Sequence, residues 1–358
     1  MPPFDDAAAA VVPVDASAAS EARTRHAQLT KPPGSLGRLE DAGARLAAVA
    51  RICPPPVPDP AAVAVFAGDH GVLAQGVTPW PQEVTAQMVA NFCAGGAAVN
   101  VLARHVGATV TVVDVGVVGD LPAAPGLEVR KVRRGTADLA TGPAMSEADA
   151  VAALDVGADI AAQLVRTGAR CLLTGDMGIG NTTPSAALIA AFTDSPAEEV
   201  TGRGTGIDDM RLAKKRAIVA AAAARVAGKP PLCVLASAGG LEIAALAGFV
   251  VGGAAAGVPV LLDGVIACAG ALAAVALVPD AVGYLFAGHR SSEPGATVAL
   301  AHLGLEPLLD LDLRLGEGTG ACLALPVLQG AAKVLAQMAT FTSAGVSGKE
   351  DTDRAPAG

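Results

Sequence analysis

Ala62-Val-Ala-Val-Phe66, followed at once by Ala67-Gly-Asp-His-Gly71, is the stretch that decides the fold. A short apolar run with β-branched residues that stops in a polar, glycine-containing turn predicts a strand buried on both faces. The same pattern recurs, and it predicts further strands at Ala108–Asp114, Arg170–Thr174, Val258–Asp263 and Tyr284–Ala287.

Longer apolar stretches separate these strands. They predict helices at Pro81–His105, Glu147–Thr167, Leu241–Ala256 and Val265–Val278. Strands that alternate with helices form βαβ units, so we expect an α/β fold with a doubly wound, mainly parallel sheet. Ligands of such sheets bind in the loops that follow the strands.

Both chain ends have helical patterns, and Pro54-Pro55-Pro56 separates the first of them from the sheet. We predict a flexible segment over residues 1–20 and the N-terminal part of a small helical domain over 21–56. The α/β domain is expected over 57–305. The C-terminal part of the small domain is expected over 306–350, and this part includes the loop around Glu317.

The composition raises the question of a membrane protein, because 52% of the residues are hydrophobic and the mean hydropathy is +0.49. The stretch from Leu241 to Pro279 is long enough to span a bilayer. However, Glu242 and Asp263 interrupt it, and the chain starts without the basic region of a signal peptide. We therefore expect a soluble protein with no membrane insertion.

The charged residues and cysteines exclude further classes. With 25 Lys+Arg against 34 Asp+Glu the net charge is −9, which offers no basic surface to a nucleic acid. The six cysteines stand singly and the five histidines do not cluster with them, which argues against zinc and against a disulfide framework. Reduced thiols of this kind predict a cytoplasmic protein.

The loop Gly175–Pro184 is the first that could carry chemistry. Gly175, Gly178 and Gly180 let a ligand approach the backbone, and Pro184 starts a helix whose free N–H groups suit a phosphate. The alternative is a tight turn between a strand and a helix, without a ligand.

A second glycine loop, Thr201–Asp209, leads into a helix that carries Lys214 and Lys215. Two glycine loops with cations close by would suit a phosphomonoester. The alternative for the two lysines is a solvated helix face.

Glu317 lies between Gly316 and Gly318 in an otherwise apolar segment. Burial there would raise the pKa of its carboxyl, as a general base near neutral pH requires. The alternative is a glutamate that caps a helix or a turn.

Two other loops carry weaker signals. Asp69 and His70 follow the first strand, where such a pair more often anchors a loop than forms a catalytic dyad. Gly288-His-Arg-Ser-Ser-Glu-Pro-Gly295 follows the last strand and has the residues of an ordinary helix N-terminus. The chain has no Gly-x-Ser-x-Gly motif, which argues against a serine hydrolase.

Several of these loops, in this order, resemble one known family. The chain resembles the nicotinate-nucleotide–dimethylbenzimidazole phosphoribosyltransferases, enzymes of cobalamin nucleotide-loop assembly, from about residue 21 to 340. The matching stretches are Lys31-Pro-Pro-Gly-Ser-Leu-Gly-Arg-Leu-Glu40, Ala67-Gly-Asp-His-Gly-Val72, Pro81-Gln-Glu-Val-Thr-Ala-Gln-Met88, Gly175–Pro184, Pro259-Val-Leu-Leu-Asp-Gly264, Ala301-His-Leu303 and Arg314-Leu-Gly-Glu-Gly-Thr-Gly320.

The resemblance implies that a phosphoribosyl group passes from nicotinate mononucleotide to 5,6-dimethylbenzimidazole, with inversion, to give α-ribazole 5′-phosphate and nicotinate. It also implies a homodimer that uses neither a cofactor nor a metal. The family's general base corresponds to Glu317. The residues that would hold the phosphate and ribose are Gly175, Asp176, Gly178, Gly180, Asn181, Gly202 and Lys215.

An apolar wall is expected for the flat base, with Trp80, Met88 and Leu315 as lining candidates. A core position is the alternative for Trp80. Some relatives carry Ser and Gln where Trp80 and Met88 stand, and Glu where Asp176 stands. The accepted base is therefore left open among dimethylbenzimidazole, benzimidazole, adenine and a phenolic compound. A nucleotide-binding sensor without catalysis is the alternative function.

Overall fold

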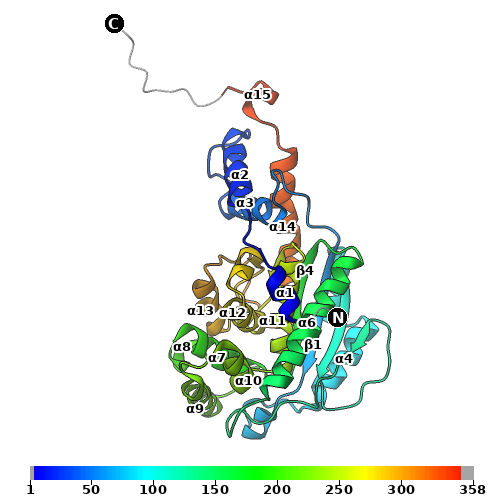
Figure 1. The fold of residues 1–358 in the computed structure, drawn as a ribbon, viewed down its shortest axis with the longest axis vertical. Coiled ribbons are helices and arrows are strands. Elements are labelled where there is room, and N and C mark those ends of the chain that lie inside the picture. The colour runs from blue at the N-terminus through cyan, green and yellow to red at the C-terminus, as the bar shows by residue number, and fades with distance from the viewer. Residues whose placement is uncertain (1–3, 348–358) are drawn as a thin grey trace.

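The computed structural model describes residues 4–347 of the chain. Its centre is a six-stranded sheet in which all neighbouring strands are parallel (Figure 1). The strand order is β3-β2-β1-β4-β5-β6, which is the order of a doubly wound fold. The strands are β1 Ala61–Gly68, β2 Thr109–Gly116, β3 Leu127–Val129, β4 Cys171–Met177, β5 Val260–Leu262 and β6 Leu285–Ala287.

The predicted α/β class with a doubly wound parallel sheet is confirmed, although at least one end of every predicted strand differs and one strand was not predicted. β3 was not predicted, because it is a three-residue edge strand without an apolar run. β4 continues beyond Thr174, so Gly175 and Asp176 lie in the strand opposite Val65 and Phe66 of β1. Strand ends depend on such pairing, which a local pattern does not reveal.

Helices cover both faces of the sheet. α11 packs on the central strands with α6 and α12 beside it, and α4, α5 and the start of α14 pack on the other face. The helices are α1 Phe4–Ala10, α2 Ala16–Gln28, α3 Arg38–Ala50, α4 Glu83–Ala94, α5 Ala98–His105, α6 Glu147–Arg166, α7 Thr182–Thr193, α8 Ala197–Val200, α9 Asp209–Val226, α10 Pro231–Ala238, α11 Leu241–Ala255, α12 Val265–Leu277, α13 Pro294–Leu303, α14 Thr319–Gln337 and α15 Phe341–Ala344, with 3₁₀ turns at Gly71–Gln75 and Pro279–Tyr284.

Local chemistry sets several helix ends. The Ser146 hydroxyl accepts the Asp149 N–H at 3.1 Å while the Asp149 carboxylate accepts the Ser146 N–H at 3.2 Å, a capping box that starts α6. The predicted helix Pro81–His105 is instead two helices. Gly95 adopts a left-handed conformation, with φ +77°, and ends α4 there.

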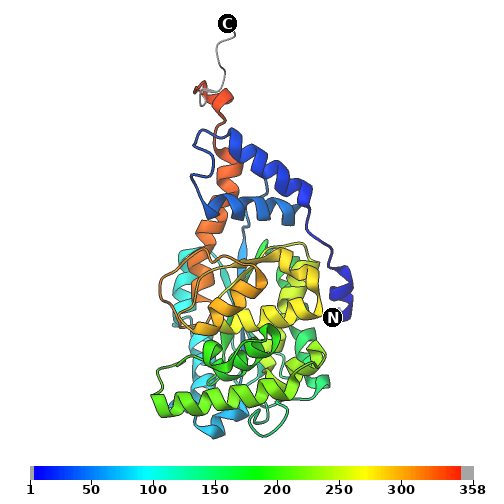
Figure 2. The same ribbon diagram turned by 90° about the vertical axis from the view of Figure 1, so that its left-hand side faces the viewer.

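A small helical unit, made of α2, α3 and the last turns of α14, lies beyond one end of the sheet (Figure 2). Its two chain segments come from opposite ends of the sequence. Its buried core consists mainly of alanine, which lets the helices approach closely; the members are Ala18, Ala22, Ala44, Ala47 and Leu335.

α14 connects this helical unit with the sheet. Its N-terminal end packs beside β4 and β5, and its C-terminal end reaches Leu335 in the core of the helical unit. A helix of 19 residues spans about 28 Å, so one element belongs to both parts. The Glu317 loop therefore lies at the sheet, on the α/β side of the boundary that the sequence suggested at residue 305. Residues 348–350 of the predicted C-terminal part lie outside the described residues.

The start of the chain differs from the predicted flexible segment. Residues 4–10 form α1 and residues 16–20 begin α2, and α1 packs on α6 and α11. Phe4 is buried, its N–H donates to the Asp155 carboxylate at 2.6 Å, and the Tyr284 hydroxyl donates to the Val12 carbonyl at 2.9 Å. These anchors lie far along the chain, so the alanine-rich segment itself gave no sign of them. Residues 1–3 lie outside the described residues.

The apolar stretch that raised the membrane question forms α11 and α12, which are buried inside the protein. Two other stretches, Glu83–His105 and Thr319–Gln337, are long and apolar enough to span a bilayer by length and composition alone. The first is interrupted between α4 and α5. The second is α14. Of its most apolar 18 residues, 56% are buried against the sheet and the helical unit.

α6 and α11 approach so closely that only glycine fits at two positions. A Cβ at Gly157 of α6 would overlap the Ala245 carbonyl oxygen, and a Cβ at Gly248 of α11 would overlap the Leu154 carbonyl oxygen. These direct backbone contacts hold the helix pair against the sheet.

We expect Gly157→Ala to lower the free energy of unfolding by about 3 kcal/mol, because the added methyl group must push α6 and α11 apart. Chemical denaturation of both proteins measures the difference.

Gly330→Ala is the matched control. Gly330 lies in α14, and a Cβ added there would have no atom within 4 Å, so alanine should stabilise the helix by up to about 1 kcal/mol. Equal effects of the two substitutions would contradict the importance of the α6–α11 contact.

Candidate functional site

The candidate site lies at the carboxyl ends of β1 and β4, the adjacent central strands from which the chain winds in opposite directions. Ligands of doubly wound sheets bind at this point. β1 ends at Gly68 and β4 at Met177, and the glycine loop after β4 leads into α7 at Thr182.

A cavity of about 290 Å³ opens at this edge; we call it the sheet-edge cavity. It brings together residues from the predicted phosphate loop, the lysine helix, the Glu317 loop and the predicted apolar wall. The predicted residues that line it are Trp80, Met88, Asp176, Gly178, Gly180, Asn181, Lys215, Leu315 and Glu317.

The two remaining predicted residues, Gly175 and Gly202, support this cavity without lining it. A Cβ at Gly175 would overlap the Glu317 carbonyl oxygen, so glycine lets the Glu317 loop lie directly on β4. The Gly202 carbonyl accepts a hydrogen bond from the Lys215 ammonium at 3.1 Å.

Lys215 is the buried cation of the sheet-edge cavity. Its side chain is buried, and its Nζ also donates to the Thr182 hydroxyl at 2.8 Å. Burial lowers the pKa of Lys215 to about 8, with the charge of Glu293 opposing the shift. Lys214, the preceding residue, is exposed, so the solvated-face alternative applies to Lys214 only.

Glu317 is the carboxyl group at the other side of the cavity. It is 6% exposed and adopts a left-handed conformation with φ +65°, and one carboxylate oxygen accepts the Val99 N–H at 3.3 Å. Burial raises the pKa of Glu317; the Val99 N–H opposes this shift, and the negative charge of Asp263 adds to it. The Val99 N–H belongs to the first turn of α5, so Glu317 caps that helix and not the helix that follows it, and the capping alternative stays open.

Asp176 belongs to a carboxyl cluster formed with Glu242, Asp263 and Glu317. Asp176 is 5% exposed, and its Oδ2 accepts a hydrogen bond from the Asn181 amide at 2.9 Å. Burial raises the pKa of Asp176 well above its ordinary value, the Asn181 amide opposes the shift, and the three other carboxylates add to it. Several acids therefore share one water-poor edge of the sheet.

Asp69 and His70 anchor loops beside the cavity and do not line it. The Asp69 carboxylate accepts the Val118 N–H at 2.8 Å. His70 Nε2 lies 2.8 Å from Glu242 Oε1, with both side chains fully buried. Burial lowers the pKa of His70, but the nearby Glu242 carboxylate outweighs this and leaves it raised. This arrangement agrees with the loop-anchor interpretation.

Trp80, Met88 and Leu315 form an apolar wall of the sheet-edge cavity. Trp80 is 51% exposed and Leu315 is 58% exposed, so the core alternative for Trp80 is wrong. The hydroxyls of Thr78 and Thr205 lie 3.1 Å apart and join the Trp80 segment to the second glycine loop.

Nine further residues, which the sequence motifs did not predict, also line the sheet-edge cavity. They come from the Trp80 segment, the start of α4, the two glycine loops and the start of α7: Val77, Thr78, Val84, Met177, Ile179, Thr182, Arg203, Gly204 and Thr205. Six of these stand within the two glycine loops, so proximity to the motifs is the signal that could have found them: Met177, Ile179, Thr182, Arg203, Gly204 and Thr205.

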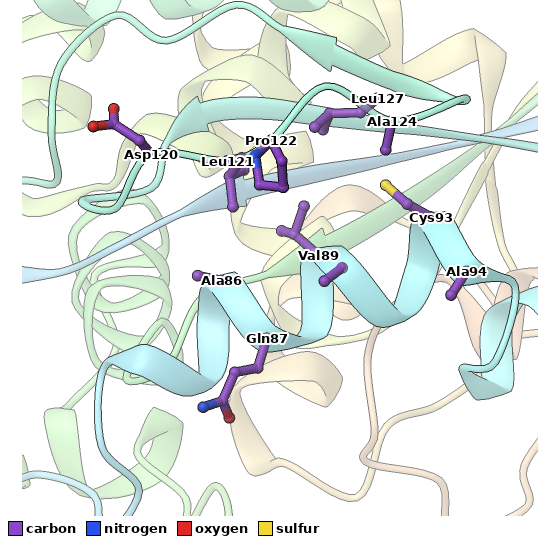
Figure 3. Close-up of a pocket in the computed structure, with 11 residues that line it drawn as sticks. Ala86, Gln87, Val89, Cys93, Ala94, Asp120, Leu121, Pro122, Ala124 and Leu127 are labelled. Atoms are coloured by element: carbon purple, nitrogen blue, oxygen red, sulfur yellow. The ribbon is translucent and has the colours of Figure 1, made fainter.

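A larger cavity, of about 520 Å³, lies between α4 and the segment before β3. Figure 3 shows Val89 and Cys93 of α4 opposite Pro122 and Leu127. Burial raises the pKa of the Cys93 thiol, which disfavours the reactive thiolate. Apart from Gln87, Cys93 and Asp120 its lining side chains are aliphatic, and no lysine or arginine lines it, so it lacks the combination of acids and cations found in the sheet-edge cavity.

A family model described as phosphoribosyltransferase matches residues 11–346. The chain belongs to this phosphoribosyltransferase family. It is thus a pentosyl-transferring enzyme, and the resemblance recognised in the sequence is confirmed.

Named relatives of the phosphoribosyltransferase match over almost their whole length. A nicotinate-nucleotide–dimethylbenzimidazole phosphoribosyltransferase of Salinispora tropica is 58% identical over 357 residues, covering 95% of this chain and 98% of its own. One of Chloroflexus aurantiacus is 54% identical over 339 residues, covering 94% and 96%. The crystal structure of CobT from Thermus thermophilus matches with a TM-score of 0.90 and 52% identity, covering 93% of this chain and 100% of that one.

Within residues 4–347, no group of three or more His, Cys, Asp or Glu side chains is arranged to hold a metal ion. That the phosphoribosyltransferase works without a metal or cofactor stays a prediction.

We expect Asp176→Asn to remove part of the pH dependence of stability. In the unfolded chain the Asp176 carboxyl loses its proton at about pH 4. In the folded chain its pKa is higher, so the carboxyl keeps its proton to higher pH. Stability then falls as the pH rises from the unfolded-state pKa to the folded-state pKa. The stability of Asp176→Asn relative to the wild type, measured by thermal unfolding, should therefore grow as the pH rises above about 4.

Asp280→Asn, at an exposed position away from the cluster, controls for the loss of any carboxylate. If the stability difference between Asp176→Asn and the wild type stays constant with pH, the pKa of Asp176 is not raised in the folded protein.

Proposed function

We propose that this enzyme transfers the 5-phosphoribosyl group of nicotinate mononucleotide to 5,6-dimethylbenzimidazole, giving α-ribazole 5′-phosphate and nicotinate. One observation carries the proposal: the Glu317 carboxyl and the Lys215 ammonium line the same cavity, and an apolar wall lies beside them. A base, an anion holder and a surface for a flat ring are the three elements that this transfer needs.

The reaction requires one proton transfer. A ring nitrogen of the benzimidazole attacks C1′ of the ribose, and Glu317 takes the proton from the other ring nitrogen. The bond between C1′ and the nicotinate nitrogen breaks, and its electron pair neutralises the positive pyridinium ring. Attack opposite the leaving group inverts C1′, which gives the α-anomer.

The buried position of Glu317 suits this role. A general base works best when its pKa lies near the working pH, and burial moves the Glu317 carboxyl in that direction. The removal of water also strengthens interactions with charge that develops on the ribose.

The nucleotide's phosphate and ribose are proposed to lie along the two glycine loops. Gly178, Gly180 and Asn181 offer a close backbone approach beside α7, and Lys215 offers a positive charge. Asp176, Gly175 and Gly202 support this part of the site. The partly exposed Trp80, Met88 and Leu315 are proposed to hold the base, which is apolar and planar.

The proposal includes a homodimer, a cytoplasmic location, and neither a cofactor nor a metal. The family resemblance supports the dimer. In addition, only 33% of the most apolar 18 residues of the Glu83–His105 stretch are buried. Subunit contacts often cover such exposed apolar surfaces. The singly placed cysteines support a reducing compartment.

Two alternatives differ in what they predict. The wall built from Trp80 and Met88 is compatible with another acceptor, such as benzimidazole, adenine or a phenolic compound. A sensor that binds nucleotide without catalysis would release no nicotinate in the presence of any base. The raised pKa of Glu317 favours catalysis over the sensor.

Incubation with nicotinate mononucleotide and a panel of bases tests the function. We expect nicotinate release and, with dimethylbenzimidazole, a product of α-configuration, identified by mass spectrometry and NMR. A β-anomer, or saturable nucleotide binding without turnover, would contradict the proposal.

Glu317→Gln is the matched variant for this assay. The amide can still accept the Val99 N–H but cannot take a proton, so turnover should fall by about 10²- to 10⁴-fold with nucleotide binding retained. Unchanged turnover would remove Glu317 from the mechanism.

The pH dependence tests Lys215. Because the pKa of Lys215 is about 8, kcat/KM for the nucleotide should fall as the pH rises through this value and the ammonium loses its proton. Lys215→Met should raise KM by about 10- to 100-fold, as expected for the loss of a charge-assisted hydrogen bond, and should abolish this alkaline decline.

Lys214→Met, which removes the exposed neighbour on the same helix, should leave KM and its pH dependence unchanged. If kcat/KM still falls at alkaline pH in Lys215→Met, another group causes the decline.

A further inference from the structure

The loop that carries Glu317 is held by a carboxylate from another strand. Asp263 directly follows β5 and is 1% exposed. Its Oδ2 accepts the Gly318 N–H at 3.1 Å, and its Oδ1 accepts the N–H groups of Gly320 at 2.7 Å and Ala321 at 3.1 Å. One buried side chain therefore bonds to three backbone groups immediately after Glu317.

The local backbone needs this support. Gly316, Glu317 and Gly318 all have positive φ, of 84°, 65° and 104°, and for Glu317 this conformation is strained. α14 then starts after Gly318, which has no side chain to cap the first N–H groups of the helix. Asp263 supplies the missing acceptors from the sheet.

Asp263 is itself held in place. Its N–H donates to the Thr174 hydroxyl of β4 at 2.9 Å. His289, which follows β6, brings Nε2 to 3.4 Å from Asp263 Oδ1, and its ring lies where a side chain at Gly320 would be. Three neighbouring strands thus fix the position of this carboxylate.

We propose that Asp263, held by Thr174 and His289, is a positioning residue that keeps the Glu317 carboxylate aimed into the sheet-edge cavity. The inference rests on the proposed role of Glu317 as general base. Asp263 acts through the backbone of the loop and does not line the cavity.

Asp263 also contributes its charge. Asp263 of the β5 end raises the pKa of Glu317, whereas the Val99 N–H of α5 lowers it. Asp176 of β4 interacts electrostatically with Glu317 and Asp263, and Glu242 of α11 acts on Asp176. Replacing Asp263 with a neutral residue should therefore lower the pKa of Glu317.

Asp263→Asn tests both effects with almost no change in shape. The amide nitrogen cannot accept the Gly318 N–H, so the loop should loosen next to Glu317. We expect kcat to fall by about 10- to 100-fold, as for a small misplacement of a reacting group, with KM for the nucleotide changed by less than about 2-fold. The acid limb of the kcat–pH profile should move to lower pH, because Glu317 then ionises more easily.

Asp15→Asn is the matched control. The Asp15 carboxylate also accepts backbone N–H groups at a helix start, from Ser17 at 2.8 Å and Ala18 at 3.3 Å, but in the small helical unit. This variant should keep the wild-type kcat and acid limb.

Thr174→Val separates geometry from charge. It removes the acceptor of the Asp263 N–H but keeps the carboxylate, so kcat should fall while the acid limb stays in place. If Asp263→Asn does not fold, as judged by circular dichroism, Thr174→Val carries the test, and a wild-type kcat in it overturns the proposal.

A folded Asp263→Asn with wild-type kcat, or with an unmoved acid limb, would also overturn it. If Glu317→Gln is inactive in the same assay, only the positioning role fails; if Glu317→Gln is fully active, the proposed general base itself fails.

Discussion

Backbone packed directly against backbone is the constraint on which this structure depends. Gly157 lets α6 touch α11 over the sheet, and Gly175 lets β4 lie against the backbone of Glu317. A methyl group at either position would overlap a carbonyl oxygen. The Gly175 contact lets the Glu317 loop lie directly on β4 at the carboxyl edge of the sheet. Burial is the largest cause of the raised pKa values of Asp176 and Glu317 at this edge.

Burial at the carboxyl edge of the sheet shifts the pKa values of Glu317 and Lys215 in opposite directions. Burial makes the Glu317 carboxylate a stronger base and makes the Lys215 ammonium release its proton more easily, because each charged form loses its solvation. Both groups keep specific partners that offset part of this cost: the Val99 N–H for the carboxylate, and the Thr182 hydroxyl for the ammonium. Asp263 accepts three backbone N–H groups beside Glu317, and its negative charge raises the pKa of Glu317.

The sequence predicted most of the sheet and half of the residues that line the sheet-edge cavity. Glycine loops, a lysine after one of them and a glutamate between two glycines are local patterns, and Gly178, Lys215 and Glu317 do line one cavity. Asp263 received no role, because its partners lie 55 to 58 residues further along the chain. The anchoring of Phe4 was missed for the same reason. An acceptor and donor so far apart leave no spacing that a sequence pattern can reveal.

The sequence by itself determined the α/β class, the parallel sheet and the residue types available for chemistry, because hydrophobic periodicity and turn residues act over a few neighbouring positions. Only the tertiary structure decided which residues meet. It moved Gly175 and Asp176 into a strand, set Glu317 at the sheet instead of in the helical unit, and left Trp80 half-exposed at the cavity. Burial, and with it every pKa shift, depends on what packs against a residue, and that is decided by segments distant in the chain.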